Sequence, residues 1–152
     1  MYQALTSTRP WTLGSDPDLE LNRDPAVASV GRALPPHRYE QEELIEAFSQ
    51  VWKDDSKGIK RIQRLHRAVQ VQGRNLALPI EKYLSLDGFG DANDVFIEVG
   101  TQIAGEAIID ALAKVDLTPA DVDAIFFTTV TGLATPTIDA RLVNRIGLRR
   151  NV

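Results

Sequence analysis

Apolar positions recur every three or four residues in four stretches of the chain, the spacing typical of helices with one buried face. The first stretch predicts a helix over about 39–52, with acidic residues in its first turn. Further helices are predicted for about 56–69, about 93–115 and 138–146. The helix over 93–115 is the longest, and Gly147 should end the last one, because glycine readily adopts the left-handed conformation of a helix C-terminus.

Two other stretches are apolar and β-branched without helical spacing. Residues 27–30 predict a short strand, which the proline pair at 35–36 ends. The run Ala124-Ile-Phe-Phe-Thr-Thr-Val130 is continuously apolar or β-branched, which is typical of a strand covered on both faces. Residues 73–93 resemble a loop. Strands that alternate with helices in this order predict an α/β layered fold, a sheet covered by helices.

Two local motifs support the helical elements. Thr118-Pro-Ala-Asp121 predicts a helix start, with the threonine as N-cap, proline at the first helical position and the aspartate as a second capping group. Small residues in the longest helix, Gly100, Ala104 and Gly105, should allow another element to pack closely against it.

The predicted fold is incomplete by itself. A buried central strand needs a neighbour on each side, and only two strands are predicted. We therefore expect residues 27–152 to form the N-terminal part of a larger fold. Residues 1–26 are acidic, interrupted by prolines and without apolar periodicity, so we interpret them as an N-terminal extension.

Composition and charge exclude several classes of protein. The 152 residues are 43% hydrophobic and 25% charged, which is ordinary for a soluble α/β domain. No apolar run approaches the roughly 20 residues of a membrane span, and no secretion signal is apparent, so a cytoplasmic protein is expected. A net charge of −4 disfavours nucleic-acid binding as the main function.

Cysteine and histidine limit the chemistry that this chain can perform. The chain has no cysteine, which removes disulfides, zinc thiolates and thiol nucleophiles. His37 and His66 do not have the spacing of metal ligands, so no metal site is predicted.

A basic face lies on the predicted helix over 56–69. At helical spacing, its cationic side chains gather within roughly a third of the circumference; they are Lys53, Lys57, Lys60, Arg61, Arg64 and Arg67. Such a face can bind phosphates, which arginine contacts through two N–H groups at once. A solvated outer face is the default for an amphipathic helix, and spacing alone leaves both interpretations open.

A second candidate site follows the run over 124–130. The segment Thr128-Thr-Val-Thr-Gly-Leu-Ala-Thr-Pro136 turns at Gly132 and leads into the last helix. Ligands gather at the carboxyl ends of strands in open α/β sheets, so hydroxyls and small residues here could line a pocket. The same segment also reads as a tight strand-to-helix turn, and the two interpretations are compatible.

These two segments carry a family resemblance. Ile62-Gln-Arg-Leu65, the turn at 128–136 and Ile146-Gly-Leu-Arg149 together resemble bacterial type III polyketide synthases, the chalcone-synthase-like branch of the thiolase fold. The opening Val27-Ala-Ser-Val-Gly-Arg-Ala-Leu-Pro-Pro36 and Phe89-Gly-Asp-Ala-Asn-Asp94 are also similar to members of that branch. The resemblance covers about residues 27–152 and implies the N-terminal half of a thiolase-like layered fold.

The resemblance implies a homodimeric acyltransferase. Such enzymes load an acyl-CoA onto a cysteine, extend it with malonyl-CoA units by decarboxylative condensation and cyclise the product. Coenzyme A thioesters are their substrates, and no further cofactor is implied. The missing C-terminal half of the fold would be a partner of this chain.

The resemblance also assigns binding residues. Arg61 and Arg64 match two of the family's CoA-phosphate cations. Plant members usually have a third lysine where this chain has Ala68, and Arg67 beside it is the candidate for the third contact.

The remaining assignments fall in the turn. Val130 and Thr131 match residues that line the initiation and elongation cavity, and Gly132 follows them. Thr135, followed by Pro136, matches the residue that reaches across the dimer into the partner's cavity.

The family's nucleophilic cysteine would fall roughly ten residues beyond Val152, and its histidine and asparagine partners later still. We therefore expect the 152-residue chain alone to be inactive in condensation. Release of CoA and formation of a pyrone from acyl-CoA and malonyl-CoA by this chain would contradict that expectation.

Two alternatives stay open at the level of sequence. The parent could be a ketoacyl-synthase III or HMG-CoA-synthase relative with the same fold, although Thr-Gly-Leu-Ala-Thr-Pro and Gly-Asp-Ala-Asn favour the polyketide branch. The chain could also be a non-catalytic CoA-binding or dimerisation module that pairs with a full-length synthase.

Overall fold

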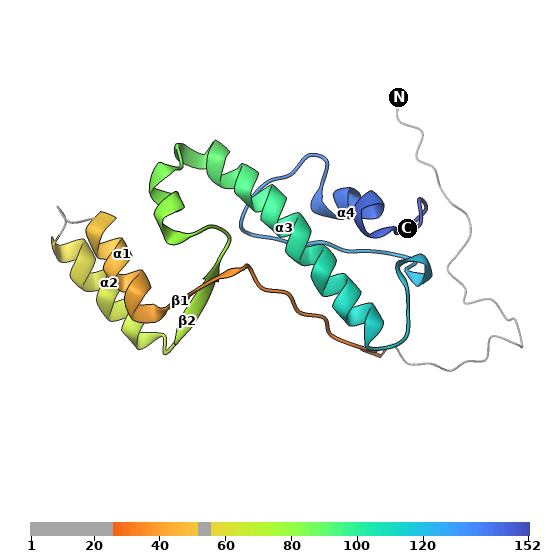
Figure 1. The fold of residues 1–152 in the computed structure, drawn as a ribbon, viewed down its shortest axis with the longest axis horizontal. Coiled ribbons are helices and arrows are strands. Elements are labelled where there is room, and N and C mark those ends of the chain that lie inside the picture. The colour runs from red at the N-terminus through yellow and green to blue at the C-terminus, as the bar shows by residue number, and fades with distance from the viewer. Residues whose placement is uncertain (1–25, 52–55) are drawn as a thin grey trace, which may run out of the picture.

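The computed structural model describes residues 26–51 and 56–152. The predictions made for residues 1–25, Trp52 and Lys53 lie outside the described residues. The elements follow in the order β1 (His37–Glu40), α1 (Gln41–Val51), α2 (Ser56–Ala68), β2 (Gly73–Leu76), the 3-10 helix η2 (Ile80–Ser85), α3 (Gly88–Ala113), the 3-10 helix η3 (Pro119–Asp121) and α4 (Ile138–Ile146). Figure 1 shows the sheet, α1 and α2 at one end of an elongated molecule and α4 beside α3 at the other.

The four predicted helices are confirmed, with two shifted starts. The first begins at Gln41, since Tyr39 and Glu40 belong to β1. The longest begins at Gly88, five residues before the prediction, and the Asp91 carboxylate in its first turn accepts a hydrogen bond of 2.8 Å from the N–H of the preceding Asp87.

A small antiparallel sheet forms that was not predicted, and its second strand lies where a loop was expected. β1 pairs with β2, and the register places Tyr39 opposite Arg74 and Glu40 opposite Gly73. The loop prediction for residues 73–93 is wrong for β2 because the sequence Gly-Arg-Asn-Leu lacks an alternating apolar pattern. The Tyr39 hydroxyl accepts a hydrogen bond of 3.0 Å from the Ile80 N–H, which ties η2 to the sheet.

Both predicted strands are wrong in this structure. Residues 27–30 and 124–130 run without strand pairing, because no segment of the described chain lies in register beside them. An apolar, β-branched run indicates a preference for extended backbone. A strand also needs a neighbouring segment with which to form hydrogen bonds. The expected burial on both faces is also wrong, since Phe126 is 96% exposed and Val130 fully exposed.

Residues 27–32 lie against α3 instead. The Ser29 hydroxyl donates to the Ala111 carbonyl oxygen (2.7 Å), and the Arg32 N–H donates to the Asp110 carboxylate (2.9 Å). Lys114 donates both to Asp110 (2.7 Å) and to the Val30 carbonyl oxygen (3.0 Å). The hydrogen bond from Lys114 lowers the pKa of Asp110, with a further contribution from the Arg32 N–H. These contacts fix the segment on α3 without any sheet.

The main core lies between α3 and α4. Ile138, Leu142 and Leu148 are buried there, and partly buried side chains of α3 pack around them. Gly105 permits the approach, because a β-carbon at that position would lie 3.1 Å from Ile146 Cγ2. The close packing predicted from the small residues of the longest helix is thus confirmed at Gly105. Gly147 ends α4 in the left-handed conformation (φ 76°), as predicted.

The predicted cap at Thr118 is confirmed, although the helix it begins is the single 3-10 turn η3. The Asp121 carboxylate accepts hydrogen bonds from the Thr118 N–H (2.8 Å) and from its hydroxyl (2.6 Å). These bonds, the hydroxyl's foremost, hold the pKa of Asp121 below its usual range. The capped turn sets the direction of the chain as it leaves α3.

Helices α1 and α2 form a second, smaller packing unit. Leu44 and Ile45 of α1 are buried, whereas α2 has no fully buried residue. The Gln41 amide donates to the His66 carbonyl oxygen and lies equally close, at 3.0 Å, to His66 Nδ1. The Phe48 ring meets the His66 ring edge-on at 5.6 Å. His66 is therefore one of the residues that join the two helices.

Candidate functional site

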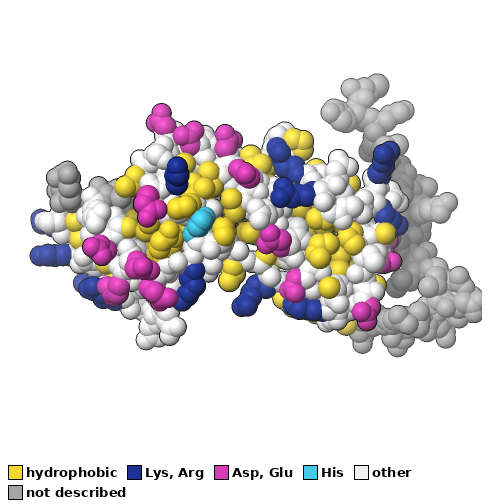
Figure 2. Space-filling model, viewed as in Figure 1, with side chains coloured by type: hydrophobic (Ala, Val, Ile, Leu, Met, Phe, Trp, Pro, Cys, Tyr) yellow, Lys and Arg dark blue, Asp and Glu magenta, His cyan; other side chains and the backbone are white. Residues whose placement is uncertain are grey.

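The basic face of α2 is exposed as the spacing predicted. The cationic side chains on it that the structure describes are Lys57, Lys60, Arg61, Arg64 and Arg67, all exposed. Figure 2 shows acidic and basic side chains close together at this end of the molecule. The opposite face of α2 is less well covered than the pattern suggested, since Leu65 and Val69 remain about half exposed.

The three arginines differ in their partners. Among the described residues, Arg61 and Arg64 have no hydrogen-bonding or ionic partner. Arg67 instead binds Glu42 of α1: its Nε donates to Oε1 at 3.2 Å and its Nη2 to Oε2 at 3.0 Å. Two unpaired guanidinium groups one turn apart are the strongest candidate for an anion-binding surface in this part of the molecule.

The turn at 128–136 is held in place by α3. The Asn93 side chain donates to the Leu133 carbonyl oxygen (2.9 Å) and accepts from the Leu133 N–H (2.8 Å), so one amide satisfies both backbone groups. Gly132 lies so close to α3 that a β-carbon there would overlap the Phe96 ring. The role of Asn93 was not predicted from the sequence, where only its place in the Gly-Asp-Ala-Asn motif pointed to it.

The predicted cavity residues are only partly brought together. Gly132 lines a hollow of about 330 Å³; the other lining residues are Phe96, Phe127, Thr128, Thr129, Leu133, Ala134, Thr137, Ile138 and Asp139. Val130 and Thr131 are exposed and line no part of it. The Thr131 N–H donates to the Thr129 hydroxyl (3.0 Å), which tightens the turn.

The predicted dimer-crossing residues are exposed at the end of the turn. Thr135 and Pro136 are joined by a cis peptide bond, and the Pro136 carbonyl oxygen accepts a hydrogen bond of 2.9 Å from Arg141 Nε. Figure 1 shows this turn well away from α2 along the length of the molecule. The structure therefore gives two separate candidate sites.

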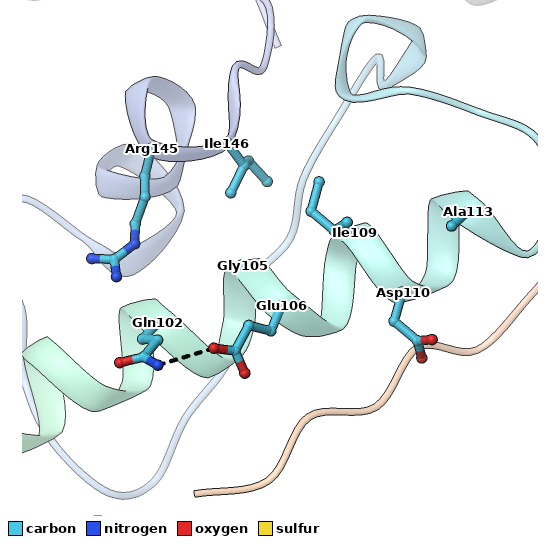
Figure 3. A pocket seen from close by; sticks show the side chains of 8 residues that line it. All are labelled: Gln102, Gly105, Glu106, Ile109, Asp110, Ala113, Arg145 and Ile146. Atoms are coloured by element: carbon cyan, nitrogen blue, oxygen red, sulfur yellow. Dashed lines mark hydrogen bonds between the residues drawn. The ribbon is translucent and has the colours of Figure 1, made fainter. Parts of the chain in front are cut away.

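A second hollow, at α3 and α4, was not predicted from the sequence. It has a volume of about 720 Å³ and lies between α3 and α4; its lining residues are Gln102, Gly105, Glu106, Ile109, Asp110, Ala113, Arg145 and Ile146. Figure 3 shows Arg145 directed from α4 toward α3, and the hydrogen bond of 3.0 Å from Gln102 to Glu106. Gly105 was the available signal, since it allows α4 to cross α3 here.

Residues 26–51 and 56–152 contain neither a metal-binding cluster nor a membrane-spanning helix. No group of three or more histidine and acidic side chains in these ranges is arranged to hold a metal ion. Among the helices described, none combines the length and the apolar character needed to cross a membrane.

Solved structures identify the fold. The chain superposes with a TM-score of 0.69 and 28% identity on the crystal structure of 1,3,6,8-tetrahydroxynaphthalene synthase from Streptomyces coelicolor A3(2), a bacterial type III polyketide synthase. The match covers 82% of this chain and 36% of that one. The chain therefore has a partial thiolase-like α/β fold, rich in helix and with a small sheet.

Sequence relatives give the family within that fold. The chain is 42% identical over 132 residues to the 1,3,6,8-tetrahydroxynaphthalene synthase of Streptomyces peucetius subsp. caesius. It is 29% identical over 125 residues to a putative chalcone synthase of Bacillus subtilis. These matches cover 87% and 79% of this chain. The chain is a homologue of the type III polyketide synthases and corresponds to their N-terminal part.

The matched region makes up most of this chain but a minor part of each relative. The chain spans 35% and 34% of the length of these two proteins, about a third of each. No protein-family model matches it. The resemblance first drawn from five short motifs is thus confirmed by sequence and by fold, and the ketoacyl-synthase III and non-catalytic alternatives are not favoured.

Proposed function

We propose that this chain forms the N-terminal part of a type III polyketide synthase that condenses an acyl-CoA starter with malonyl-CoA units. In this proposal α2 binds the phosphates of coenzyme A, and the turn at 128–136 contributes to the cavity and to the dimer interface. The enzyme is a cytoplasmic homodimeric acyltransferase that uses CoA thioesters and no other cofactor. Because the chain has no cysteine, we assign the covalent step to residues outside it.

The main support for this proposal is that the side chains of Arg61 and Arg64 are available for binding on the surface of α2. Both guanidinium groups are exposed and have no partner among the described residues, so binding a phosphate costs them no ion pair. Lys57 and Lys60 add positive charge on the same face. Arg67 is the proposed third cation, although it already has a carboxylate partner.

The cavity role is supported by the hold that α3 has on the turn. Asn93 and Gly132 fix the backbone, so Val130 and Thr131 project from a rigid segment rather than a loose loop. Thr135 and Pro136 are exposed, as residues that reach into a partner subunit must be. We propose Val130, Thr131 and Gly132 as cavity residues and Thr135 and Pro136 as the dimer-crossing pair.

The double variant Arg61→Ala/Arg64→Ala tests the proposal. We expect it to weaken CoA binding by at least about tenfold, because each arginine supplies charge-assisted hydrogen bonds to phosphate. Isothermal titration calorimetry of the 152-residue chain with coenzyme A measures the effect. The affinity of the unchanged chain should also fall as salt is added.

The matched control is Arg145→Ala/Arg150→Ala. It removes the same charge from α4 and from the segment after it, at the end of the molecule away from α2. CoA affinity should change little in this control. Equal losses in the two double variants, or no binding by the unchanged chain, would refute the role of α2.

A further inference from the structure

Arg67 is the one arginine of the proposed phosphate surface that is already bound to a carboxylate in the described structure. Both oxygens of Glu42 accept from its guanidinium group, at 3.2 and 3.0 Å. This two-point arrangement is the one an arginine offers to a phosphate. Glu42 therefore occupies one of the two hydrogen-bonding edges of the Arg67 guanidinium group and offsets its positive charge, so Arg67 is a weaker contact for a phosphate than Arg61 or Arg64.

The fold places Glu42 at this position. Glu42 is in the first turn of α1, and Arg67 is in the last turn of α2, which lies antiparallel to it. The preceding residues on the two helices are also joined, because the Gln41 amide donates to the His66 carbonyl oxygen at 3.0 Å. The geometry of the pair is thus fixed by the packing of the helices as well as by two long side chains.

Both partners are charged at neutral pH. The hydrogen bond from Arg67 holds the pKa of Glu42 below the usual range of a carboxyl group, and Glu42 raises the pKa of Arg67 in return. The Arg67 side chain is 59% exposed and the Glu42 side chain 67% exposed, so added salt weakens the attraction between them.

The pair lies beside the candidate phosphate contacts. Arg64 and Arg67 are three positions apart on one helix and therefore neighbours on its surface. The Glu42 carboxylate thus brings a negative charge to the edge of a surface that must attract phosphates.

We propose that Glu42 withholds Arg67 from the phosphate surface formed by Arg61 and Arg64, and so limits how tightly α2 holds a phosphate-bearing ligand. The inference rests on the proposed binding of CoA by α2. Arg61 and Arg64 provide the main contacts, and Arg67 becomes a third contact only when the charge of Glu42 is removed or screened.

The variant Glu42→Gln tests this inference. It keeps the shape of the side chain and removes its charge, while the contacts of Gln41 with His66 and of Gln63 with Ser49 (3.2 Å) keep α1 and α2 together. We expect coenzyme A to bind about two- to fivefold more tightly to it at low salt, the range that corresponds to one surface ion pair. The gain should vanish in Glu42→Gln/Arg67→Ala.

Two further variants separate the pair from a general change in charge. Glu46→Gln removes a negative charge one turn further along α1, where no ion pair is formed in the described structure, and should increase affinity less than Glu42→Gln. Arg67→Ala should change the affinity for coenzyme A by less than about twofold, because Arg67 is already paired with Glu42 and contributes little to phosphate binding. An Arg67→Ala loss as large as that of Arg64→Ala, or equal affinities of Glu42→Gln and the unchanged chain, would overturn the inference.

A direct measurement on Arg67 complements the affinities. In nuclear magnetic resonance spectra, its Nε–H signal should respond to added coenzyme A in Glu42→Gln and stay unchanged in the original chain. A response of equal size in both would also overturn the inference, and thermal unfolding of each variant verifies that it is folded.

Failure of the proposed function gives a different result. If the unchanged chain and Glu42→Gln both fail to bind coenzyme A, the proposed function falls. The role of Glu42 is then judged with inorganic pyrophosphate as the probe. Tighter binding of pyrophosphate by Glu42→Gln than by Glu42→Gln/Arg67→Ala would uphold it, and equal binding would reject it.

Discussion

Leu142→Ala should lower the free energy of unfolding by about 2–5 kcal/mol, the cost of removing a large side chain from a packed interior. Leu142 is 0% exposed and lies with Ile138 and Leu148 in the core between α3 and α4. The α3 backbone at Gly105 is already in close contact with α4, so the helices have little room to collapse into the cavity. Urea denaturation followed by circular dichroism measures the loss.

The expected loss of stability in Leu142→Ala is large for a small domain. A small domain is commonly stable by only about 5–15 kcal/mol, so this single change removes a large part of the total. Leu84→Ala is the matched control, because Leu84 is 70% exposed and should cost less than about 0.5 kcal/mol. A Leu142→Ala protein as stable as this control would contradict the buried position of α4 on α3.

Gly31→Ala should destabilise the protein by about 1–3 kcal/mol, the usual cost of forcing extra atoms into a packed site. A β-carbon at position 31 would overlap the Ala107 carbonyl oxygen and lie 2.7 Å from the Ala111 nitrogen. Both contacts are with the backbone of α3, which cannot turn aside as a side chain can. The segment over 27–32 would have to move off the helix and lose the hydrogen bond from Ser29.

Gly90→Ala is the natural comparison for this substitution. Gly90 lies in α3, where a β-carbon would have no other atom within 4 Å, and alanine is the better helix former by up to about 1 kcal/mol. The two glycine-to-alanine changes should therefore shift the urea midpoint in opposite directions. A shift in the same direction for both would show that residue 31 does not lie against α3.

Local patterns allowed the helices to be predicted, because helical hydrogen bonds and apolar spacing involve residues close in sequence. The cap at Thr118 and the stop at Gly147 were predicted for the same reason. Strands depend on partners elsewhere in the chain, so β1 and β2 were missed, and the β-prone runs at 27–30 and 124–130 proved unpaired.

Features of the candidate sites were likewise predictable only where they depend on residues close in sequence. Helical spacing was enough to predict the exposed cationic face of α2, since the face is a property of one helix. The pairing of Arg67 with Glu42 joins positions 25 residues apart, and the hold of Asn93 on Leu133 joins positions 40 apart. Neither leaves a periodic mark in the sequence, so only the packing of the elements reveals them.

The separation of α2 from the turn at 128–136 has a consequence for combined variants. The two segments lie at different places along the molecule and share no contact among the hydrogen bonds and ion pairs of the described residues. Substitutions in distant regions without shared partners affect free energy additively. A variant that combines one substitution in each segment should therefore lose stability by about the sum of the two single losses.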